Sequence, residues 1–474
     1  MRSPAQDRLQ SVKTSREVIL NRHIFRQYDI RGVAYEELTP EIAEAIGAAI
    51  GTMIRRKRGS RMAVGRDCRV SSDELKDALL AGLVSAGITV TDIGLSTTPL
   101  LYYSVFTLDV DGGVMVTGSH NPPDMNGFKI MLGKDTIHGE QIQDIVRLIE
   151  AEDFESGEGS VAAHDVKPAY WKDLSQRARI RPGLKVGVDF GNGTGAITTL
   201  ALLDQAGCEI HPLYAEPDGS FPNHHPDPTV VSNLQALQQL VTSRHLDLGV
   251  AYDGDADRLG VVDNRGQVIF GDMLMVLYSR HILARNPDAA IIGEVKCSQR
   301  MYNDIAAHGG RPVMWKTGHS LIKEKLKTED ALLAGEMSGH IFFRDRYYGF
   351  DDACYATLRL LEILSEKEDV PLSEMLTDLP PAVSTPEIRV ECPDDIKFGI
   401  VDRAIRHFSS IYETITVDGV RILFEKGWGL IRVSNTQPVI VVRFEAESNS
   451  LLAAYRKEVE EFLGKEGLSL PGPE

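Results

Sequence analysis

The sequence predicts an α/β protein in which three tandem, topologically similar α/β domains precede a C-terminal α+β domain. The first observation is a unit that occurs three times: a β-rich run, a polar loop, a helical pattern closed by glycine, and a second β-rich run. This order is typical of a βαβ unit. The second is the length of 474 residues, which exceeds one compact unit at about 150 residues per domain. The third is a different pattern of short β runs after Val383.

The three units begin at Met62, Lys185 and Ala289, more than 100 residues apart. Each helical pattern is followed by a glycine, at positions 87, 207 and 309, which is a common way to end a helix. The units are too widely spaced and too different in sequence for a solenoid. We therefore expect three related domains in a row.

The C-terminal part alternates β runs with two helical patterns. We expect strands at 387–391, 421–424, 429–433 and 439–446, and helices at 395–410 and 451–463. This order suggests a small α+β domain over an antiparallel sheet. We expect an N-terminal extension, 1–22, and four domains, 23–163, 164–266, 267–380 and 381–474. The boundaries between the domains lie at or near polar or proline-containing stretches, 152–160, 264–270 and 371–386.

Composition excludes several classes of protein. Against 51 basic residues stand 68 acidic ones, a formal net charge of −17, so we expect no nucleic acid and no anionic membrane as partner. The apolar stretch 42–54 is too short for a membrane helix, and the N-terminus lacks the apolar core of a signal peptide. Five scattered cysteines without a CxxC pair suit a reducing cytosol. We expect a cytoplasmic monomer or weak dimer that binds a small molecule.

The first polar loop follows the apolar run 114–117 and reads TGSHNPP. Because Asn-Pro favours a turn, we expect Ser119 to be exposed on a tight loop beside His120, with Lys129 further along. Such a serine could act as a nucleophile or carry a phosphoryl group. The alternative is an ordinary turn.

The second polar loop reads DGDADR and follows a hydrophobic strand. Asp253, Asp255 and Asp257 alternate, and carboxylates this close repel one another unless a cation neutralises them. Oxygen ligands select Mg²⁺, Mn²⁺ or Ca²⁺ over zinc, and Arg258 replaces the glycine that an EF-hand requires. A solvated acidic turn is the alternative.

Two further loops carry groups for sugar and phosphate recognition. In GEMSGH, Glu336, Ser338 and His340 have period-two spacing, so an extended segment would turn all three to one side for polyol binding and proton transfer. In RVSNTQP, Arg432 precedes hydroxyl and amide side chains that suit a phosphate clamp. The alternatives are a surface strand and a hairpin connection.

A glycine-rich segment, 191–196, satisfies the relaxed dinucleotide pattern G-x-G-x-x-A. However, no acidic residue closes the following strand, where a ribose partner is expected; from Glu209 that strand runs into His211-Pro212. We interpret the glycines as a tight strand-to-helix turn.

Taken in order, TGSHNPPDMNGFKI, DGDADR, GEMSGH and RVSNTQP resemble the four signature loops of the α-D-phosphohexomutase family. FRQYDIRG, FPNHHPDPT and RPVMWKTGHSLIK resemble its bacterial phosphomannomutase/phosphoglucomutase branch, and the resemblance covers about 24–463. It implies four domains around a central cleft and reversible conversion of hexose 6-phosphate and hexose 1-phosphate, with mannose or glucose as the sugar. It also implies a phosphoserine enzyme, Mg²⁺, and a hexose 1,6-bisphosphate intermediate that serves as activator.

The resemblance implies a role for each loop and its domain. Ser119 of domain 1 would be the phosphoserine and a metal ligand, with Asp253, Asp255 and Asp257 of domain 2. Glu336 and Ser338 of domain 3 would bind sugar hydroxyls. The phosphate clamp of domain 4 would consist of Arg432, Ser434, Asn435 and Thr436. The residues that line the cleft would be Arg31, His120, Lys129, Arg258, Lys296, His319 and His340. We expect His340 or Lys129 to be the general base.

Departures from the family pattern are Ala256, Val433 and Gln437. Ala256 replaces a usual glycine, so this position either avoids positive φ or tolerates strain there. Three other functions stay open: a phosphoglucosamine mutase of the same family, a phosphatase that uses Ser119 covalently, and a non-catalytic sugar-phosphate-binding protein.

Overall fold

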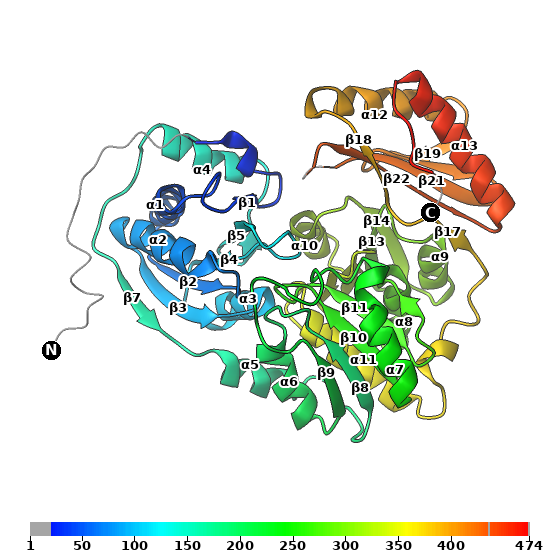
Figure 1. Cartoon of the computed structure of the whole chain (residues 1–474), viewed down its shortest axis with the longest axis horizontal. Helices are drawn as coiled ribbons and strands as arrows, with labels where there is room; N and C mark the ends of the chain where they lie inside the picture. The colour runs from blue at the N-terminus through cyan, green and yellow to red at the C-terminus, as the bar shows by residue number, and fades with distance from the viewer. Residues whose placement is uncertain (1–19, 435–436, 473–474) are drawn as a thin grey trace.

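The computed structural model describes residues 20–434 and 437–472 and contains four β-sheets in succession along the chain. Residues 1–19 of the expected extension lie outside the described part. Figure 1 shows the fourth sheet, in orange and red, set apart at the upper right. Within 20–434 and 437–472, no helix combines the length and the apolar character needed to cross a membrane.

The first sheet has the strand order β1-β5-β4-β2-β3-β7, with β6 paired to β5. Its strands are β1 (Ile30–Val33), β2 (Arg61–Arg66), β3 (Thr89–Leu95), β4 (Gly112–Val116), β5 (Met125–Leu132), β6 (Asp135–Thr136) and β7 (Ser160–Ala163). Its helices are η1 (Arg22–Ile24), α1 (Pro40–Arg56), α2 (Ser72–Ser85), α3 (Thr98–Thr107) and α4 (Glu140–Glu150).

The second sheet has the order β12-β11-β10-β8-β9 and the third the order β14-β13-β15-β16. The second comprises α5 (Lys167–Leu174), β8 (Lys185–Asp189), α6 (Ala196–Gln205), β9 (Glu209–Leu213), η2 (Val231–Leu234), α7 (Gln235–Arg244), β10 (Leu248–Tyr252), β11 (Leu259–Asp263) and β12 (Val268–Ile269). The third sheet and its helices comprise α8 (Gly271–Leu283), β13 (Ala290–Glu294), α9 (Gln299–Ala307), β14 (Arg311–Trp315), α10 (His319–Thr328), β15 (Leu333–Gly335), β16 (Ile341–Phe343), α11 (Ala353–Glu366) and η3 (Leu372–Glu374).

The fourth sheet has the order β17-β22-β21-β20-β19, with β18 also paired to β22, and its pairs are antiparallel. Its elements are β17 (Val383–Ser384), β18 (Ile388–Glu391), α12 (Asp394–Ser409), β19 (Glu413–Ile415), β20 (Val420–Phe424), β21 (Gly427–Val433), β22 (Val439–Ala446) and α13 (Asn449–Lys465). The predicted α+β domain is confirmed. The short strands β17 and β19 were not expected.

The first three sheets share one strand arrangement. The predicted units are β2-α2-β3, β8-α6-β9 and β13-α9-β14, and each pairs its two strands in parallel. The first strand of each unit also pairs in parallel with a third strand, β4, β10 or β15. That third strand pairs antiparallel with the next strand, β5, β11 or β16. The expected fold class, with three topologically similar domains, is confirmed.

The glycines that close the three unit helices adopt the left-handed conformation. Their φ values are +81° at Gly87, +74° at Gly207 and +76° at Gly309, a region that residues with a Cβ enter at a cost.

One apolar core joins the sheets of the first three domains, and the fourth domain has a core of its own. Helix α11 lies at the centre of the joint core, where residues 353–364 are all buried. This shared core fixes the loops of three sheets relative to one another.

Candidate functional site

Three of the four polar loops occupy the same place in the repeated fold. Residues 117–124 join β4 to β5, residues 253–258 join β10 to β11, and residues 336–340 join β15 to β16. Each loop is therefore the turn between the third parallel strand and its antiparallel neighbour. The fourth loop, 434–438, is the hairpin between β21 and β22.

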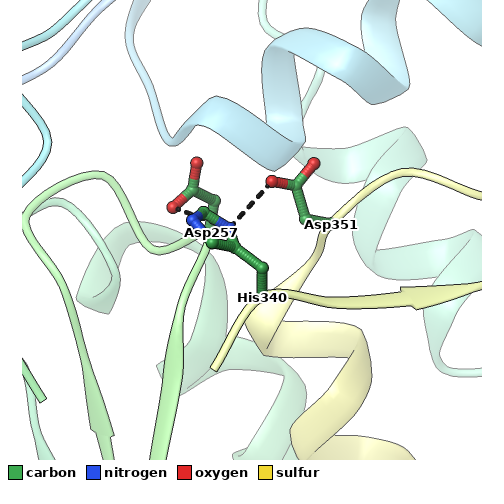
Figure 2. A group of neighbouring side chains, drawn as sticks. All are labelled: Asp257, His340 and Asp351. Atoms are coloured by element: carbon green, nitrogen blue, oxygen red, sulfur yellow. Dashed lines mark ion pairs between the residues drawn. The ribbon is translucent and has the colours of Figure 1, made fainter. Parts of the chain in front are cut away.

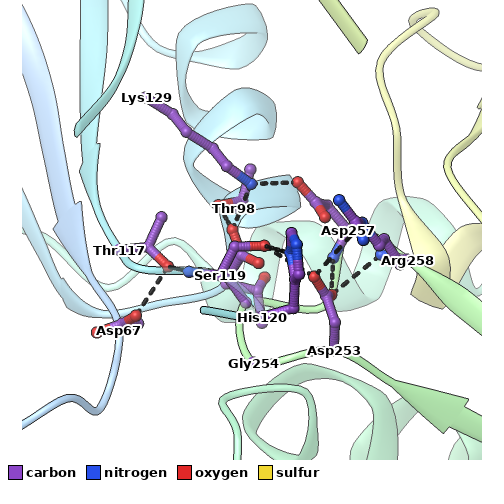
Figure 3. A network of polar contacts seen from close by, with 12 residues as sticks. Asp67, Thr98, Thr117, Ser119, His120, Lys129, Asp253, Gly254, Asp257 and Arg258 are labelled. Carbon is purple, nitrogen blue, oxygen red and sulfur yellow. Dashed lines mark hydrogen bonds and ion pairs between the residues drawn. The ribbon is translucent and has the colours of Figure 1, made fainter. Parts of the chain in front are cut away.

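Ser119 lies against the carboxylates of the second loop. Its Oγ donates a hydrogen bond to Asp253 Oδ2 at 2.9 Å, and His120 Nδ1 lies 3.3 Å from the same Oγ (Figure 3). The backbone of Ser119 is left-handed, with φ of +50°. The expectation that Ser119 is exposed is wrong, because it is only 1% exposed. A Cβ on Gly254 would lie 2.4 Å from the Ser119 carbonyl oxygen, so the second loop covers the serine.

The three aspartates of the second loop form a buried cluster. Asp253, Asp255 and Asp257 are each 0% exposed, and one carboxylate oxygen of each lies within 4.8 Å of the others. Burial and the two neighbouring carboxylates raise the pKa of Asp253 well above its usual value. Burial alone would do the same to Asp255, but Lys129 and the Thr98 hydroxyl, at 2.5 Å, hold the pKa of Asp255 below its usual value.

This cluster fits a hard divalent cation. Asp255 Oδ1 and Asp257 Oδ1 are buried and have no hydrogen-bond partner among the described residues. Such atoms are costly unless something satisfies them. Three carboxylates with a serine hydroxyl beside them make the all-oxygen donor set that Mg²⁺ prefers.

Lys129 shares these carboxylates. Its Nζ lies 2.6 Å from Asp255 Oδ2 and also contacts Asp257. Burial would lower the pKa of Lys129, but the neighbouring carboxylates outweigh burial and raise it above its usual value. Lys129 thus supplies positive charge beside the carboxylates.

The glycine-rich segment supports the metal loop. Thr194 N donates to Gly254 O at 2.9 Å, and a Cβ on Gly193 would lie 2.8 Å from the same oxygen. The interpretation as a tight turn agrees with this contact. Ala256 adopts φ of +59°, so this position tolerates strain rather than avoiding it.

His340 of the third loop lies between an arginine and an aspartate. Arg258 Nε donates to His340 Nε2 at 2.9 Å, and His340 Nδ1 lies 3.0 Å from Asp351 Oδ2 and 3.6 Å from Asp257 Oδ1 (Figure 2). Asp351 is fully buried and also pairs with Lys323 at 3.1 Å. Burial opposes ionisation, but Lys323 and His340 hold the pKa of Asp351 well below its usual value.

Burial lowers the pKa of His120 and of His319. Burial, Arg258 and Arg31 lower the pKa of His120 well below its usual value. Burial and Lys323 do the same to His319, whose ring stacks on His340 at a centroid distance of 5.7 Å. Neither ring nitrogen of His319 has a hydrogen-bond partner among the described residues.

Arg31 belongs to the same part of the site. Its Nε donates to Asp29 Oδ2 at 2.6 Å, and its Nη1 reaches Asn121 Oδ1, in the serine loop, at 3.3 Å.

The third loop is a turn, not the extended segment that period-two spacing predicted. Gly339 N donates to Glu336 O, and Gly339 has φ of +92°. The turn brings Ser338 Oγ 3.0 Å from Glu336 Oε2, whereas His340 contacts Arg258 and Asp351. Glu336 Oε1 also accepts from Gly318 N at 2.8 Å.

Lys296 lies beside the third loop. Its Nζ pairs with Glu387 at 3.0 Å and lies 3.9 Å from Glu294. Glu294 in turn accepts hydrogen bonds from the Met337 amide at 3.2 Å and the Thr317 hydroxyl at 2.8 Å.

Arg432 and Ser434 stand at the base of the fourth loop, while Asn435 and Thr436 lie outside the described residues. Arg432 Nε donates to Asp418 Oδ2 at 2.9 Å, and the same oxygen accepts from Thr317 N at 3.1 Å. Lys397 Nζ donates to the carbonyls of Ser434 at 2.7 Å and Gln437 at 3.0 Å. The fourth loop is thus tied both to its own domain and to the third.

The structure thus brings Ser119, His120, Lys129, the three aspartates, Arg258, His319 and His340 into one cluster. Lys296, Glu336 and Arg432 lie in a second network around Glu294, Thr317 and Asp418. Sequence reasoning missed several buried partners of these residues: Asp67, Arg69, Thr98, Glu294, Asp351 and Lys397. For Asp67 and Arg69 alone the sequence offered a signal, the polar run RDCRVSS that begins at the last residue of β2.

Comparisons with known proteins agree with this geometry. Residues 22–156, 168–266 and 270–383 match the α/β/α domains I, II and III of the phosphoglucomutase/phosphomannomutase family, and 387–462 match its C-terminal domain. The phosphomannomutase/phosphoglucomutase of Pseudomonas aeruginosa is 46% identical over 463 residues, 98% of this chain and 100% of that protein.

Solved structures show the same fold. A phosphoglucomutase/phosphomannomutase family protein from Burkholderia thailandensis superposes with a TM-score of 0.91 at 42% identity, over 96% of this chain and 100% of that one. The N-acetylphosphoglucosamine mutase of Aspergillus fumigatus, solved with GlcNAc-6P and magnesium, shares the fold with a TM-score of 0.58 at 16% identity, over 89% of this chain and 96% of that one. With its four matched domains and its near full-length relatives, this chain belongs to the phosphoglucomutase/phosphomannomutase family of enzymes.

Proposed function

We propose that this enzyme interconverts hexose 6-phosphate and hexose 1-phosphate, with mannose, glucose or both as the sugar, through a phosphoryl group carried on Ser119. The observation that carries the proposal is the placement of Ser119 Oγ 2.9 Å from Asp253 within a buried carboxylate cluster. Phosphoryl transfer depends mainly on charge neutralisation and positioning, and this cluster lies beside Lys129 and Arg258.

Ser119, Asp253, Asp255 and Asp257 would hold the magnesium ion. Bound there, the ion would neutralise charge on the transferring phosphoryl group. Lys129 and Arg258 would add positive charge from the protein, and the neutral ring of His120 would lie beside Ser119 Oγ.

His340, rather than Lys129, would accept the proton of the attacking sugar hydroxyl. The carboxylates hold Lys129 as an ammonium, so it lacks a lone pair. Arginine can only donate, so the Arg258 contact makes Nε2 of His340 an acceptor and leaves the proton on Nδ1, toward Asp351. Nε2 then carries the ring's lone pair, and Arg258 Nε has to release it before Nε2 can take the proton of the sugar hydroxyl.

Sugar and distal phosphate would bind at the second network. Glu336 and Ser338 would contact sugar hydroxyls, with Lys296 nearby, and Arg432, Ser434, Asn435 and Thr436 would grip the phosphate. Arg31 and His319 would line the cleft on the side of the Ser119 cluster. One clamp must accept the sugar in both orientations, because the hexose 1,6-bisphosphate intermediate has to turn over before it returns a phosphoryl group to Ser119.

Several further properties belong to the same proposal. Hexose 1,6-bisphosphate would act as activator, because it restores the phosphoserine. We also propose the domain ranges 23–163, 164–266, 267–380 and 381–474, a monomer or weak dimer, no nucleic-acid or membrane partner, and a cytoplasmic location. The acidic composition and the five scattered cysteines support the last two.

A coupled mutase assay with mannose 1-phosphate and glucose 1-phosphate, plus a trace of bisphosphate, tests the function. We expect turnover, and an intact mass that includes one phosphoryl group, both of them absent in Ser119→Ala. A Ser119→Ala variant with full activity would refute the proposal. Preference for glucosamine 1-phosphate would favour the amino-sugar mutase, and release of inorganic phosphate without isomerised sugar would favour the phosphatase.

A further inference from the structure

We propose that Arg69 is the positioning residue of Ser119: its buried guanidinium fixes the backbone of the serine loop, and lysine cannot replace it. The mechanistic part of this inference rests on the proposed role of Ser119. The structural part, the fixing of the loop, can be tested separately.

The guanidinium donates to the carbonyl oxygens of the serine loop. Nη2 donates to Ser119 O at 2.8 Å and to Asn121 O at 2.5 Å. Nη1 donates to Met125 O at 2.9 Å and also contacts Pro122 O. One side chain therefore joins the carbonyls on both sides of the turn that carries the serine.

The surroundings of Arg69 leave no room for another role. Its side chain is 0% exposed, and both Nη atoms already donate to carbonyls of the serine loop. A Cβ on Gly118 would lie 2.5 Å from Arg69 Cζ, and the Phe221 ring lies on the guanidinium at 5.1 Å from its centroid. Any side chain at Gly118, the residue before Ser119, would therefore collide with this arginine.

Asp67 completes the arrangement from the end of β2. Its Oδ1 accepts from Arg69 N at 3.0 Å, and its Oδ2 lies 3.3 Å from Arg69 Nε. The same carboxylate accepts from Thr117 Oγ1 at 2.7 Å and Gly118 N at 3.2 Å, and Thr117 Oγ1 accepts from Ser119 N at 2.8 Å (Figure 3). The amide side and the carbonyl side of Ser119 are both tied to the Asp67–Arg69 pair.

The hydrogen bonds from Asp67 and Arg69 matter because the backbone of Ser119 is strained. A non-glycine residue at φ of +50° persists only where its surroundings over-determine it. The planar fork of arginine directs several N–H groups outward, whereas lysine offers one compact ammonium. Arg69→Lys would keep the charge and lose the simultaneous contacts.

Displacement of Ser119 would affect the chemical step more than binding. Its carbonyl lies between Arg69 Nη2 and Gly254 of the metal loop. A misplacement of about 1 Å can lower a rate about 10²-fold. The proposed sugar and phosphate groups, Glu336 and Arg432, are not in contact with Arg69, so KM should change much less than kcat.

Two measurements on Arg69→Lys test the inference. We expect kcat to fall about 10²-fold while KM for glucose 1-phosphate stays within about threefold, and hydrogen exchange in peptides spanning 117–125 to become faster. The matched control is Arg359→Lys. Arg359 is another buried arginine; it lies in α11 and pairs with Asp345, before that helix, and with Glu362, within it. This control should change neither kcat nor hydrogen exchange in 117–125.

Unchanged exchange in 117–125, or exchange that rises equally in the Arg359→Lys control, would overturn the inference whether or not the enzyme is a mutase. A kcat within about threefold of the parent enzyme would overturn it as well. If instead the parent enzyme itself shows no mutase turnover, the proposed function fails, and the exchange experiment still decides whether Arg69 fixes the loop.

Discussion

His340 Nδ1 lies 3.0 Å from Asp351 Oδ2, both side chains being almost fully buried. Arg258 donates to the other ring nitrogen, so Nε2 is the acceptor and the proton is on Nδ1, on the side of Asp351. Asp351 would also stabilise the positive charge that His340 gains on accepting a proton.

Asp351→Asn should therefore lower kcat about 10²-fold, the lower end of what general acid–base catalysis contributes. Steady-state kinetics with glucose 1-phosphate measure the effect, and chemical denaturation accounts for the loss of the Lys323 pair. Asp352→Asn is the matched control, because Asp352 is equally buried but accepts from Tyr170 and Tyr347 instead. Equal kcat losses in the two variants would rule out a specific role for Asp351.

Lys129 contacts Asp255 and Asp257, the same carboxylates that a bound divalent cation would neutralise. Lys129→Met should therefore lower the melting temperature in EDTA, because the carboxylates then repel one another. Added Mg²⁺ should raise it by more than in the parent enzyme, since ligand binding stabilises the folded state. Thermal denaturation with and without Mg²⁺ measures both effects.

The control for this experiment is Lys325→Met, which removes an i,i+4 pair with Glu329 away from the carboxylates. It should leave the Mg²⁺-induced shift unchanged. A Lys129→Met variant with a smaller shift than the parent enzyme would mean that Lys129 helps to hold the ion instead of competing for the carboxylates.

The sequence predicted the three repeated units because hydrophobic periodicity and helix-ending glycines are local signals. It did not predict that the serine, metal and sugar loops are equivalent turns, since that depends on the pairing of β4, β10 and β15. It misjudged the burial of Ser119 and the backbone of 336–340 for a related reason. Ser119 is covered by Gly254, and Gly339 O accepts from Leu259 N, so both depend on contacts between domains. The partners Asp351 and Arg69 act through distances that no sequence spacing encodes.

Within the metal loop, Gly254 and Ala256 should respond oppositely to exchange. A Cβ at Gly254 would meet the Ser119 carbonyl at 2.4 Å, so Gly254→Ala must push the two loops apart. We expect a loss of about 1–3 kcal/mol in the free energy of unfolding, and kcat lowered about 10²-fold.

Ala256→Gly should be tolerated. It relieves the strain at φ of +59° but removes a buried methyl group and adds freedom to the unfolded chain. These effects oppose one another, so the free energy of unfolding should change by less than about 1 kcal/mol. Urea unfolding and steady-state kinetics of both variants provide the comparison, and equal responses would contradict this steric account.

Glu387 and Lys296 link the start of the fourth domain to the third, with 3.0 Å between Oε2 and Nζ. Lys296 lowers the pKa of Glu387 to about 2 from 4.5, against the opposing effect of burial. A depressed carboxylate pKa contributes stability that is fully present above the unfolded value and is lost as the pH falls toward the folded one. At about 1.4 kcal/mol per pKa unit, the contribution at pH 7 is about 3 kcal/mol.

Glu387→Gln should therefore be destabilised at pH 7, and the difference between its free energy of unfolding and that of the parent enzyme should shrink between pH 4.5 and 2. Urea unfolding followed by tryptophan fluorescence measures the difference. The control is Glu391→Gln, because Glu391 is an exposed carboxylate at the end of β18, the strand that Glu387 precedes. A difference that stays constant over this range would mean that Glu387 stabilises the fold by packing rather than by its charge.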